Sequence, residues 1–198
     1  MKYPVMEHFY TLQGEGKYTG HAAYFIRLGG CDVGCVWCDV KESWAMDVHP
    51  SYSINEILNW VKKYPVEIVV ITGGEPTLHN LNELTVSLKN AGYRTHLETA
   101  GTNLITGKWD WITLSPKKFK VPLEENLKLA KELKVVVFHK SDFDWAEKYA
   151  AKMDPNCLLY LQTEWDRREE NIPLILDYIA RKPQWVLSLQ THKYINIP

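Results

Sequence analysis

The sequence has few of the features that mark a secreted, membrane-bound or nucleic-acid-binding protein. Cysteine is scarce, with 4 residues among 198, and three of them are clustered, which is more typical of metal binding than of a disulfide framework. No apolar run approaches the roughly 20 residues that a membrane-spanning helix needs. The net charge of −1 provides no general attraction to nucleic acid. We therefore expect a cytoplasmic protein that binds neither membranes nor nucleic acid.

The composition is that of a globular chain. Hydrophobic residues make up 45% and aromatic residues 12% of the sequence, and a chain of this length can bury about 70% of its unfolded surface. No internal repeat, low-complexity segment or linker interrupts it. We expect one domain over residues 1–198.

The most informative stretch is a loop with a CxxxCxxC spacing, Cys31, Cys35 and Cys38. Thiolates are soft ligands that suit iron–sulfur clusters or zinc. A structural zinc ion needs four ligands, for which His21, Asp32 or Asp39 could supply the fourth. A four-iron cluster also takes four, so three local cysteines would leave one iron open to a small molecule. Cys157 lies in an apolar run and is expected to be a buried small hydrophobe.

Short apolar runs alternate with amphipathic segments, which predicts βα units and a parallel sheet. Ser53 and Glu56 form a capping box ahead of a helix predicted over 54–64, and further helices are predicted over 80–91, 123–133, 142–152 and 168–181. Seven strands are predicted, at 22–28, 67–72, 94–98, 111–114, 134–138, 157–161 and 185–189. A closed eight-fold barrel usually takes about 250 residues. The fold class predicted is therefore α/β, an open partial (β/α) barrel with abbreviated helices and its active site at the carboxyl ends of the strands.

The predicted strands end in polar or glycine-containing segments. Six such ends carry Cys31, Gly73-Gly74-Glu75, Glu98-Thr99, Ser115-Lys117, Gln162 and Gln190-His192. Because the carboxyl ends of parallel strands meet at one edge, we expect these residues to share one site.

Together, the cysteine loop and Gly73-Gly74-Glu75-Pro76 resemble the motifs of radical SAM enzymes. The resemblance implies that Cys31, Cys35 and Cys38 hold a [4Fe-4S] cluster whose open iron binds the amino and carboxylate groups of S-adenosylmethionine (SAM). Trp37 resembles the aromatic residue that packs near adenine. The residues expected to bind SAM are Trp37, Cys38, Asp39, Gly73, Gly74, Glu75, Gly101, Ser115, Pro116, Lys117 and Gln162.

Further motifs along the whole chain resemble one family, the 7-carboxy-7-deazaguanine synthases of queuosine and 7-deazapurine biosynthesis. The segments that carry this resemblance are Leu12-Gln13-Gly14-Glu15-Gly16, Arg27, Trp37-Cys38-Asp39, Glu98-Thr99-Ala100-Gly101, Ser115-Pro116-Lys117 and Ser188-Leu189-Gln190-Thr191-His192-Lys193. The resemblance implies conversion of 6-carboxy-5,6,7,8-tetrahydropterin to 7-carboxy-7-deazaguanine with loss of ammonia. It also implies a homodimer, with a flavodoxin- or ferredoxin-type protein as the reductant.

The residues fit that substrate. A pterin has a guanine-like edge that Gln13 and Glu15 can complement, and Arg27 can bind its carboxylate bidentately. Arg27 could instead form a surface salt bridge. The segment 190–198 is expected to fold over the site and close it. The substrate-binding residues predicted are Leu12, Gln13, Gly14, Glu15, Arg27, Thr99, His192 and Pro198, whose α-carboxylate is an acceptor; no protein side chain is assigned as a catalytic acid or base.

One position departs from the family. Its members commonly have a threonine after the Cys-Asp pair, where the hydroxyl binds Mg2+, but here that residue is Val40. A valine side chain has no oxygen, and Mg2+ demands oxygen ligands. Magnesium is therefore either held by other groups or dispensable.

Three alternatives stay open at this stage. A glycyl-radical-enzyme activase would share the cysteine and Gly-Gly-Glu-Pro motifs but not the Leu12–Gly16 and Ser188–Lys193 segments. An iron–sulfur electron carrier would not need SAM-binding strand ends. A zinc-binding module would need neither.

Overall fold

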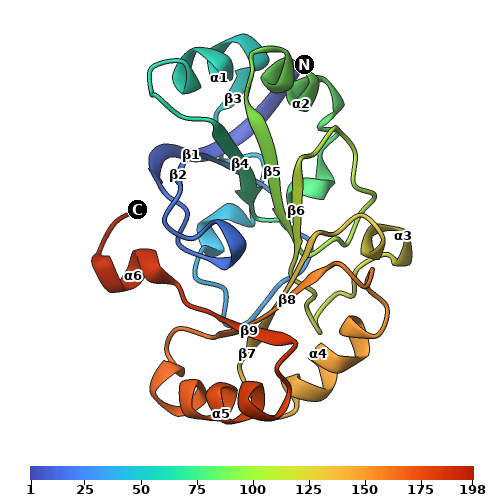
Figure 1. Cartoon of the computed structure of the whole chain (residues 1–198). Coiled ribbons are helices and arrows are strands. Elements are labelled where there is room, and N and C mark those ends of the chain that lie inside the picture. Colours follow the sequence, from blue (N-terminus) through green and yellow to red (C-terminus); the bar gives the residue numbers. More distant parts are fainter.

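The computed structural model describes residues 1–198 and contains a single nine-stranded sheet (Figure 1). The strand order is β3-β1-β2-β4-β5-β6-β7-β8-β9. The strands are β1 Lys2–Leu12, β2 Ala22–Leu28, β3 Ser51–Ser53, β4 Ile68–Gly73, β5 Arg94–Thr99, β6 Trp111–Leu114, β7 Glu132–Val137, β8 Leu158–Thr163 and β9 Trp185–Ser188. All pairs from β2 to β9 are parallel, whereas β1 is antiparallel to both β2 and β3. The predicted α/β open partial barrel is confirmed.

Most of the six helices cover the outer face of the curved sheet (Figure 1). The six are α1 Ile54–Val61, α2 Asn82–Asn90, α3 Glu124–Leu127, α4 Asp142–Ala150, α5 Arg168–Arg181 and α6 Thr191–Ile195. In Figure 1, α1 and α2 flank one end of the sheet, and α4 and α5 flank the other. The connection from β5 to β6 is not helical, in agreement with the absence of a predicted helix between residues 98 and 111. None of the helices has the length and apolar character required to cross a membrane.

Alternation along each strand divides its side chains between two environments. One set packs with the helices into the main core, in which Ile71 of β4, Leu97 of β5 and Leu161 of β8 are fully buried. The alternate set, which includes Arg27, Thr72 and Glu98, points to the inside of the barrel and lines a cavity. This two-fold periodicity places the polar groups and a second, smaller apolar cluster inside the barrel, and the main core outside it.

The sequence pattern missed two strands, β1 and β3. The other seven were predicted. Strand β1 was missed because it carries polar and aromatic residues without a regular apolar alternation. It forms a ladder with β2 and a second ladder with β3, so its pairing comes from partners that only the tertiary fold supplies. The capping box of Ser53 and Glu56 at α1 is present as predicted.

The helix predicted over 123–133 is wrong. Only Glu124–Leu127 is helical, and β7 begins already at Glu132. The Asn126 side chain donates to the carbonyl oxygens of Gly101 at 2.8 Å and Asn103 at 2.7 Å. Such side-chain-to-backbone bonds compete with helix propagation, and here they connect this segment to the loop after β5. The predicted tail 190–198 likewise contains a helix, α6.

Candidate active site

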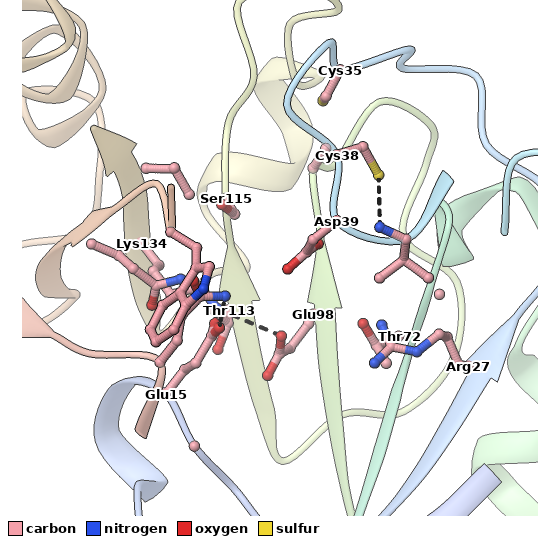
Figure 2. Close-up of a pocket in the computed structure, with 18 of the residues that line it drawn as sticks. Glu15, Arg27, Cys35, Cys38, Asp39, Thr72, Glu98, Thr113, Ser115 and Lys134 are labelled. Atoms are coloured by element: carbon pink, nitrogen blue, oxygen red, sulfur yellow. Dashed lines mark hydrogen bonds and ion pairs between the residues drawn. The ribbon is translucent and has the colours of Figure 1, made fainter. Parts of the chain in front are cut away.

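A cavity of about 270 Å³ opens at the carboxyl ends of the strands, inside the barrel (Figure 2). Strands β1, β2 and β4 to β8, the cysteine loop and the C-terminal segment all contribute to its wall. The site expected from the strand ends is thus one continuous space. The predicted site residues that line it are Leu12, Gln13, Gly14, Glu15, Arg27, Cys31, Cys35, Trp37, Cys38, Asp39, Gly73, Gly74, Thr99, Ser115, Lys117, Gln162, His192 and Pro198.

Three predicted SAM-binding residues do not line the cavity, namely Glu75, Gly101 and Pro116. Gly101 has φ +71°, and a side chain there would collide with Leu114. This glycine is therefore required by the backbone turn. Pro116 is buried behind Ser115 and Lys117, its two neighbours that do reach the cavity.

Glu75 is buried, with 1% of its surface exposed, and its carboxylate accepts four hydrogen bonds from the protein. The donors are the amide and hydroxyl of Thr77, the hydroxyl of Thr99 and the amide of Ala100 at 2.8 Å. A carboxylate with four internal donors is already satisfied. Glu75 therefore joins the ends of β4 and β5 and does not face the cavity.

The glycines before Glu75 permit a close approach of two strand ends. Gly73 has φ +139°, and a Cβ on it would overlap the backbone of Leu28. A Cβ on Gly74 would overlap the carbonyl of Gly30. The absence of side chains brings the end of β4 against the start of the cysteine loop, and both glycines still line the cavity.

The three clustered cysteines lie on the loop above the strand ends, with Cys35 and Cys38 visible in Figure 2. Burial raises the pKa of Cys35 to about 11; Lys117 opposes this shift, and the nearby Cys38 and Cys31 add to it. Cys157 is buried in the main core on the other side of the sheet. The thiols that share one loop are thus separated from the fourth cysteine, as the sequence predicts.

The donor set fits a cluster better than a single ion. No three His, Cys, Asp or Glu side chains converge in the way a lone zinc ion requires, whereas each cysteine of a four-iron cluster binds a different iron. The acidic candidates for a fourth zinc ligand already form hydrogen bonds and ion pairs with other residues. Asp32 accepts from Thr102 and Asn103, both at 3.0 Å, and pairs with Lys120 at 2.5 Å.

Asp39, the remaining acidic candidate, pairs with Lys193 of α6 at 2.7 Å. His21 is exposed beside Tyr18 and does not line the cavity. The residues therefore fit a [4Fe-4S] cluster held by Cys31, Cys35 and Cys38, with one iron free of protein ligands.

The wall next to the cysteines carries an aromatic ring and a partly buried ammonium. Lys117 lies with its Nζ 5.5 Å from the ring centroid of Trp37 and donates to Ser115 Oγ at 2.5 Å. Burial lowers the pKa of Lys117, although the nearby Cys35 opposes this shift. Gln162 accepts a hydrogen bond from Ser188 at 2.8 Å and keeps its amide nitrogen free.

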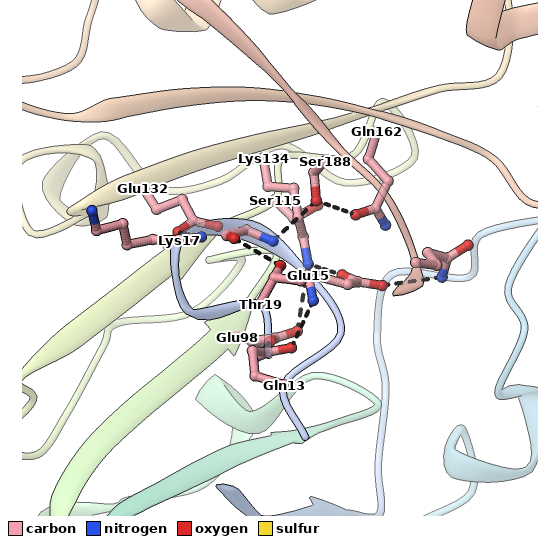
Figure 3. Close-up of polar contacts among 12 residues, drawn as sticks. Gln13, Glu15, Lys17, Thr19, Glu98, Ser115, Glu132, Lys134, Gln162 and Ser188 are labelled. Carbon is pink, nitrogen blue, oxygen red and sulfur yellow. Dashed lines mark hydrogen bonds and ion pairs between the residues drawn. The ribbon is translucent and has the colours of Figure 1, made fainter. Parts of the chain in front are cut away.

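The floor of the cavity is a buried network of charged and amide side chains (Figure 3). Gln13 donates to Glu98 at 2.8 Å, and Gln190 donates to Glu15 at 3.1 Å. Lys134 forms ion pairs with Glu15 and, at 3.5 Å, with Glu98. Burial alone would raise the pKa of Glu15, but Lys134, together with His192 and Gln190, holds that pKa below its usual value.

Sequence reasoning placed Glu98 among the strand ends of the shared site without giving it a role, and it missed Lys134. The signal was present, because Glu132, Lys134 and Val136 alternate with apolar residues along β7, and alternate residues of a strand share a face. Two charges on the inner face of a buried parallel strand point to a built polar site. The prediction began this strand at 134, so the pattern was cut short.

Arg27 points into the cavity but is not unpaired. Its Nε donates to Glu7 on β1 at 2.6 Å, which is the salt bridge that the sequence left as an alternative. Its two terminal nitrogens take part in no hydrogen bond within the protein, and Arg27 lines the cavity beside Thr72 (Figure 2). These nitrogens form the fork that binds a carboxylate bidentately.

The C-terminal segment packs over the same space. The amide of Thr191 donates to the carbonyl of Gly14 at 2.9 Å, and a side chain on Gly14 would collide with the ring of His192. Tyr194 packs edge-on against Trp165, with centroids 5.0 Å apart. Pro198 reaches the cavity wall.

Val40 also lines the cavity, where it presents only carbon atoms from its side chain. Its amide donates to Cys38 Sγ at 3.4 Å. The nearest carboxylate in sequence, Asp39, is paired with Lys193. The donor set at this position does not fit a magnesium ion, which requires oxygen ligands.

Comparison with known proteins gives a consistent result over the whole chain. Residues 25–141 match the model of the radical SAM superfamily. The chain is 52% identical to 7-carboxy-7-deazaguanine synthase from Flavobacterium psychrophilum, with 98% of this chain and 92% of the relative covered. It is 50% identical to the enzyme of that name from Synechocystis sp., covering 100% and 94%.

The structural comparison agrees with these results. The crystal structure of QueE from Escherichia coli superimposes with a TM-score of 0.86 at 33% sequence identity, covering 96% of this chain and 95% of that one. The Escherichia coli 7-carboxy-7-deazaguanine synthase is 36% identical over the full length of both chains.

Proposed function

The chain belongs to the 7-carboxy-7-deazaguanine synthase family of radical SAM enzymes, and we propose that it converts 6-carboxy-5,6,7,8-tetrahydropterin to 7-carboxy-7-deazaguanine with loss of ammonia. The observation that supports this most strongly is a single cavity with a three-thiol loop on one side and a fixed acceptor floor on the other. A glycyl-radical-enzyme activase is not favoured, because the full-length relatives carry the synthase name.

Cys31, Cys35 and Cys38 would hold the [4Fe-4S] cluster. Together with SAM, the cluster supplies when bound a 5′-deoxyadenosyl radical that can abstract hydrogen from the substrate. The cavity wall near these thiols, and the strand ends beside it, are lined by Trp37, Ser115, Lys117 and Gln162. We assign them to SAM, with the ring of Trp37 excluding water. Gly73 and Gly74 would present backbone to its amino group.

Residues of the cavity floor would recognise the pterin by hydrogen bonding. Glu15 is held as a carboxylate, and a carboxylate is an acceptor for the paired N–H groups of a guanine-like edge. Arg27 would bind the substrate carboxylate through its two free terminal nitrogens. Gln13, Thr99, His192 and Pro198 line the space around these two anchors, as do Leu12 and Gly14. The chain thereby offers one acidic and one basic anchor for a ligand with donors at one end and a carboxylate at the other.

Segment 190–198 is proposed to close the site, supported by the contacts of α6 with Gly14 and Asp39. Magnesium is proposed to be dispensable, since Val40 offers it no ligand. A cytoplasmic homodimer, reduced by a flavodoxin- or ferredoxin-type protein, is the arrangement that the family resemblance supports.

The test is anaerobic turnover of the reconstituted protein with 6-carboxy-5,6,7,8-tetrahydropterin, SAM and dithionite, with the product identified by mass spectrometry. We expect 7-carboxy-7-deazaguanine and ammonia in equal amounts, and no net consumption of SAM. Formation of 5′-deoxyadenosine without the deazaguanine would show a working cluster with a different substrate. The matched control is the Cys35→Ala protein, which should form neither.

A further inference from the structure

Lys134 is the only ammonium on the cavity floor and is almost completely buried, with 6% of its side chain exposed. It lies on the inner face of β7, which it shares with Glu132 and Val136, two residues away on either side. A buried ammonium without partners would be strongly destabilising. Here its partners are the carboxylates of Glu15 and Glu98 (Figure 3).

Each oxygen of Glu15 is held by a different element. Oε2 pairs with Lys134 on β7, and Oε1 accepts from Gln190 after β9. The backbone of the same loop is anchored separately, since the amide of Gly16 donates to Ser188 at 3.0 Å and that of Lys17 to Glu132 at 3.1 Å. Loss of Lys134 would therefore leave the Glu15 side chain held by Gln190 alone, while the backbone of its loop stays in place.

Among the three side chains that form ion pairs with one another on the floor, the charges do not cancel. Glu15 and Glu98 carry two negative charges against the one positive charge of Lys134. The surplus favours a ligand edge rich in N–H donors. Without Lys134, two buried carboxylates would face each other, and the simplest relief would be for one to take up a proton and become a donor. The floor would then present the wrong hydrogen-bonding group to such an edge.

We propose that Lys134 is a positioning residue for substrate binding: acting through Glu15, its ammonium keeps an ionised and correctly directed acceptor on the cavity floor for the N–H edge of the pterin. This rests on the proposed function for the identity of the ligand. The SAM side of the cavity is not affected in this scheme.

Several charged groups face the Glu15 carboxylate and set its ionisation. They are Lys134 from β7, His192 from α6 and Lys117 after β6, whereas Glu98 from β5 and Glu132 from β7 act on Lys134 itself. Burial raises the pKa of Glu15, and Lys134 is the largest opposing influence, followed by His192. In Lys134→Met, the pKa of Glu15 should therefore rise, and binding that needs the carboxylate should weaken as the pH falls.

The experiment measures binding of 6-carboxypterin, the fluorescent oxidised analogue, to the reconstituted holoprotein with SAM. The proteins compared are wild type, Lys134→Met, Glu15→Gln and the double variant, each titrated at several pH values between 6 and 9. The control is Lys152→Met, which removes an exposed lysine paired with Glu124 far from the cavity. Iron content and SAM affinity are measured for each protein.

We expect Lys134→Met and Glu15→Gln each to weaken binding about tenfold or more. The double variant should bind within about twofold of Glu15→Gln, because the effects of residues that act as one unit are not additive. Only Lys134→Met should gain a new pH dependence. Lys152→Met should match wild type.

Losses that multiply in the double variant, or wild-type binding by Lys134→Met, would overturn the proposal. If Lys134→Met does not hold its cluster, Lys134→Gln replaces it in every comparison, because glutamine keeps an N–H donor without the charge. If wild type does not bind 6-carboxypterin, the same proteins are compared by the KM for 6-carboxy-5,6,7,8-tetrahydropterin in anaerobic turnover, with the same expected pattern; the absence of any turnover by wild type would contradict the proposed function instead.

Discussion

Lys193 on α6 forms an ion pair of 2.7 Å with Asp39, the residue that directly follows the third clustered cysteine. The two residues are 154 positions apart in sequence, and the contact joins the C-terminal segment to the loop that would carry the cluster. Lys193 also lies 5.2 Å from the ring centroid of Trp165. One side chain thus connects three parts of the cavity wall.

We expect Lys193→Met to loosen the C-terminal segment. The pair is partly exposed, so its loss should cost at most about 1 kcal/mol, and the KM for the pterin should rise about two- to fivefold with little change in kcat. Hydrogen exchange of residues 190–198 should become faster. A variant with unchanged KM and unchanged exchange would show that the ion pair does not hold this segment. Lys182→Met, on an exposed lysine after α5, serves as the control.

Cluster binding should depend on three cysteines and not on the fourth. Cys35→Ala is expected to lose its iron, whereas Cys157→Ala should retain it, because Cys157 lies in the main core. Iron and sulfide content after anaerobic reconstitution, with the absorbance spectrum, measures this. A full, stable cluster in Cys35→Ala would contradict the assignment.

Val40→Thr tests the unusual residue after the Cys-Asp pair. Threonine is nearly the same size as valine and adds the hydroxyl oxygen that magnesium can use. Wild-type turnover should respond weakly to added Mg2+, and the variant should respond more strongly. The comparison is kcat/KM with Mg2+ and with EDTA; an equally steep dependence in wild type would show that other groups already bind the ion.

The parts of the site that could be predicted are those that follow from local sequence. The Cys31–Cys38 loop and the glycines after β4 are contiguous motifs, and Ser115 and Gln162 follow recognisable strands. Lys134 and the contacts of Glu98 were missed because both depend on a loop that precedes these residues by more than 80 positions. Only the assembled barrel shows that two charged strand residues face that loop instead of solvent.

The strand β1 was missed for a related reason. Its neighbours on either side, β2 and β3, lie later in the chain, and its own residues are too polar to reveal a buried face. Glu75 gives the opposite case, in which a residue of a recognised motif makes structural contacts that the local sequence does not reveal. Its neighbours in sequence suggest a cofactor ligand, but the donors from Thr77, Thr99 and Ala100 are visible only in the fold.

His96 should make stability depend on pH. It is 3% exposed, lies 4.5 Å from the ring centroid of Tyr18, and its Nε2 has no partner. Burial, helped by Arg94, lowers its pKa from 6.5 to about 4. The unfolded chain therefore binds a proton that the folded chain excludes, and stability falls as the pH drops from about 6.5 towards 4.

This contribution should reach about 3 kcal/mol at the acidic end. His96→Phe, which cannot titrate, should lose less stability than wild type between pH 7 and pH 4.5, as measured by urea unfolding. His139→Gln, at an exposed histidine, is the control and should follow wild type. Parallel curves for wild type and His96→Phe would be evidence against this role.

Glu75 gives the final prediction, because its contacts separate a structural role from a role in cofactor binding. The carboxylate accepts from Thr77, Thr99 and Ala100 and does not line the cavity. Hydrogen bonds to a charged acceptor contribute about 1.5–3 kcal/mol each, and they are not additive. Glu75→Gln replaces one acceptor oxygen with a donor that faces other donors. We therefore expect a loss of about 2–4 kcal/mol in the free energy of unfolding, measured with urea on the cluster-free protein. SAM affinity of the folded, reconstituted variant should fall less than about fivefold. In the protein that does fold, β4 and β5 remain joined and Gly73 and Gly74 therefore keep their places. Thr77→Val removes one of the four donors and should show a smaller loss of stability in the same direction. If Glu75→Gln instead unfolds like wild type and binds SAM at least a hundredfold more weakly, the carboxylate contacts the cofactor and the structural role is wrong.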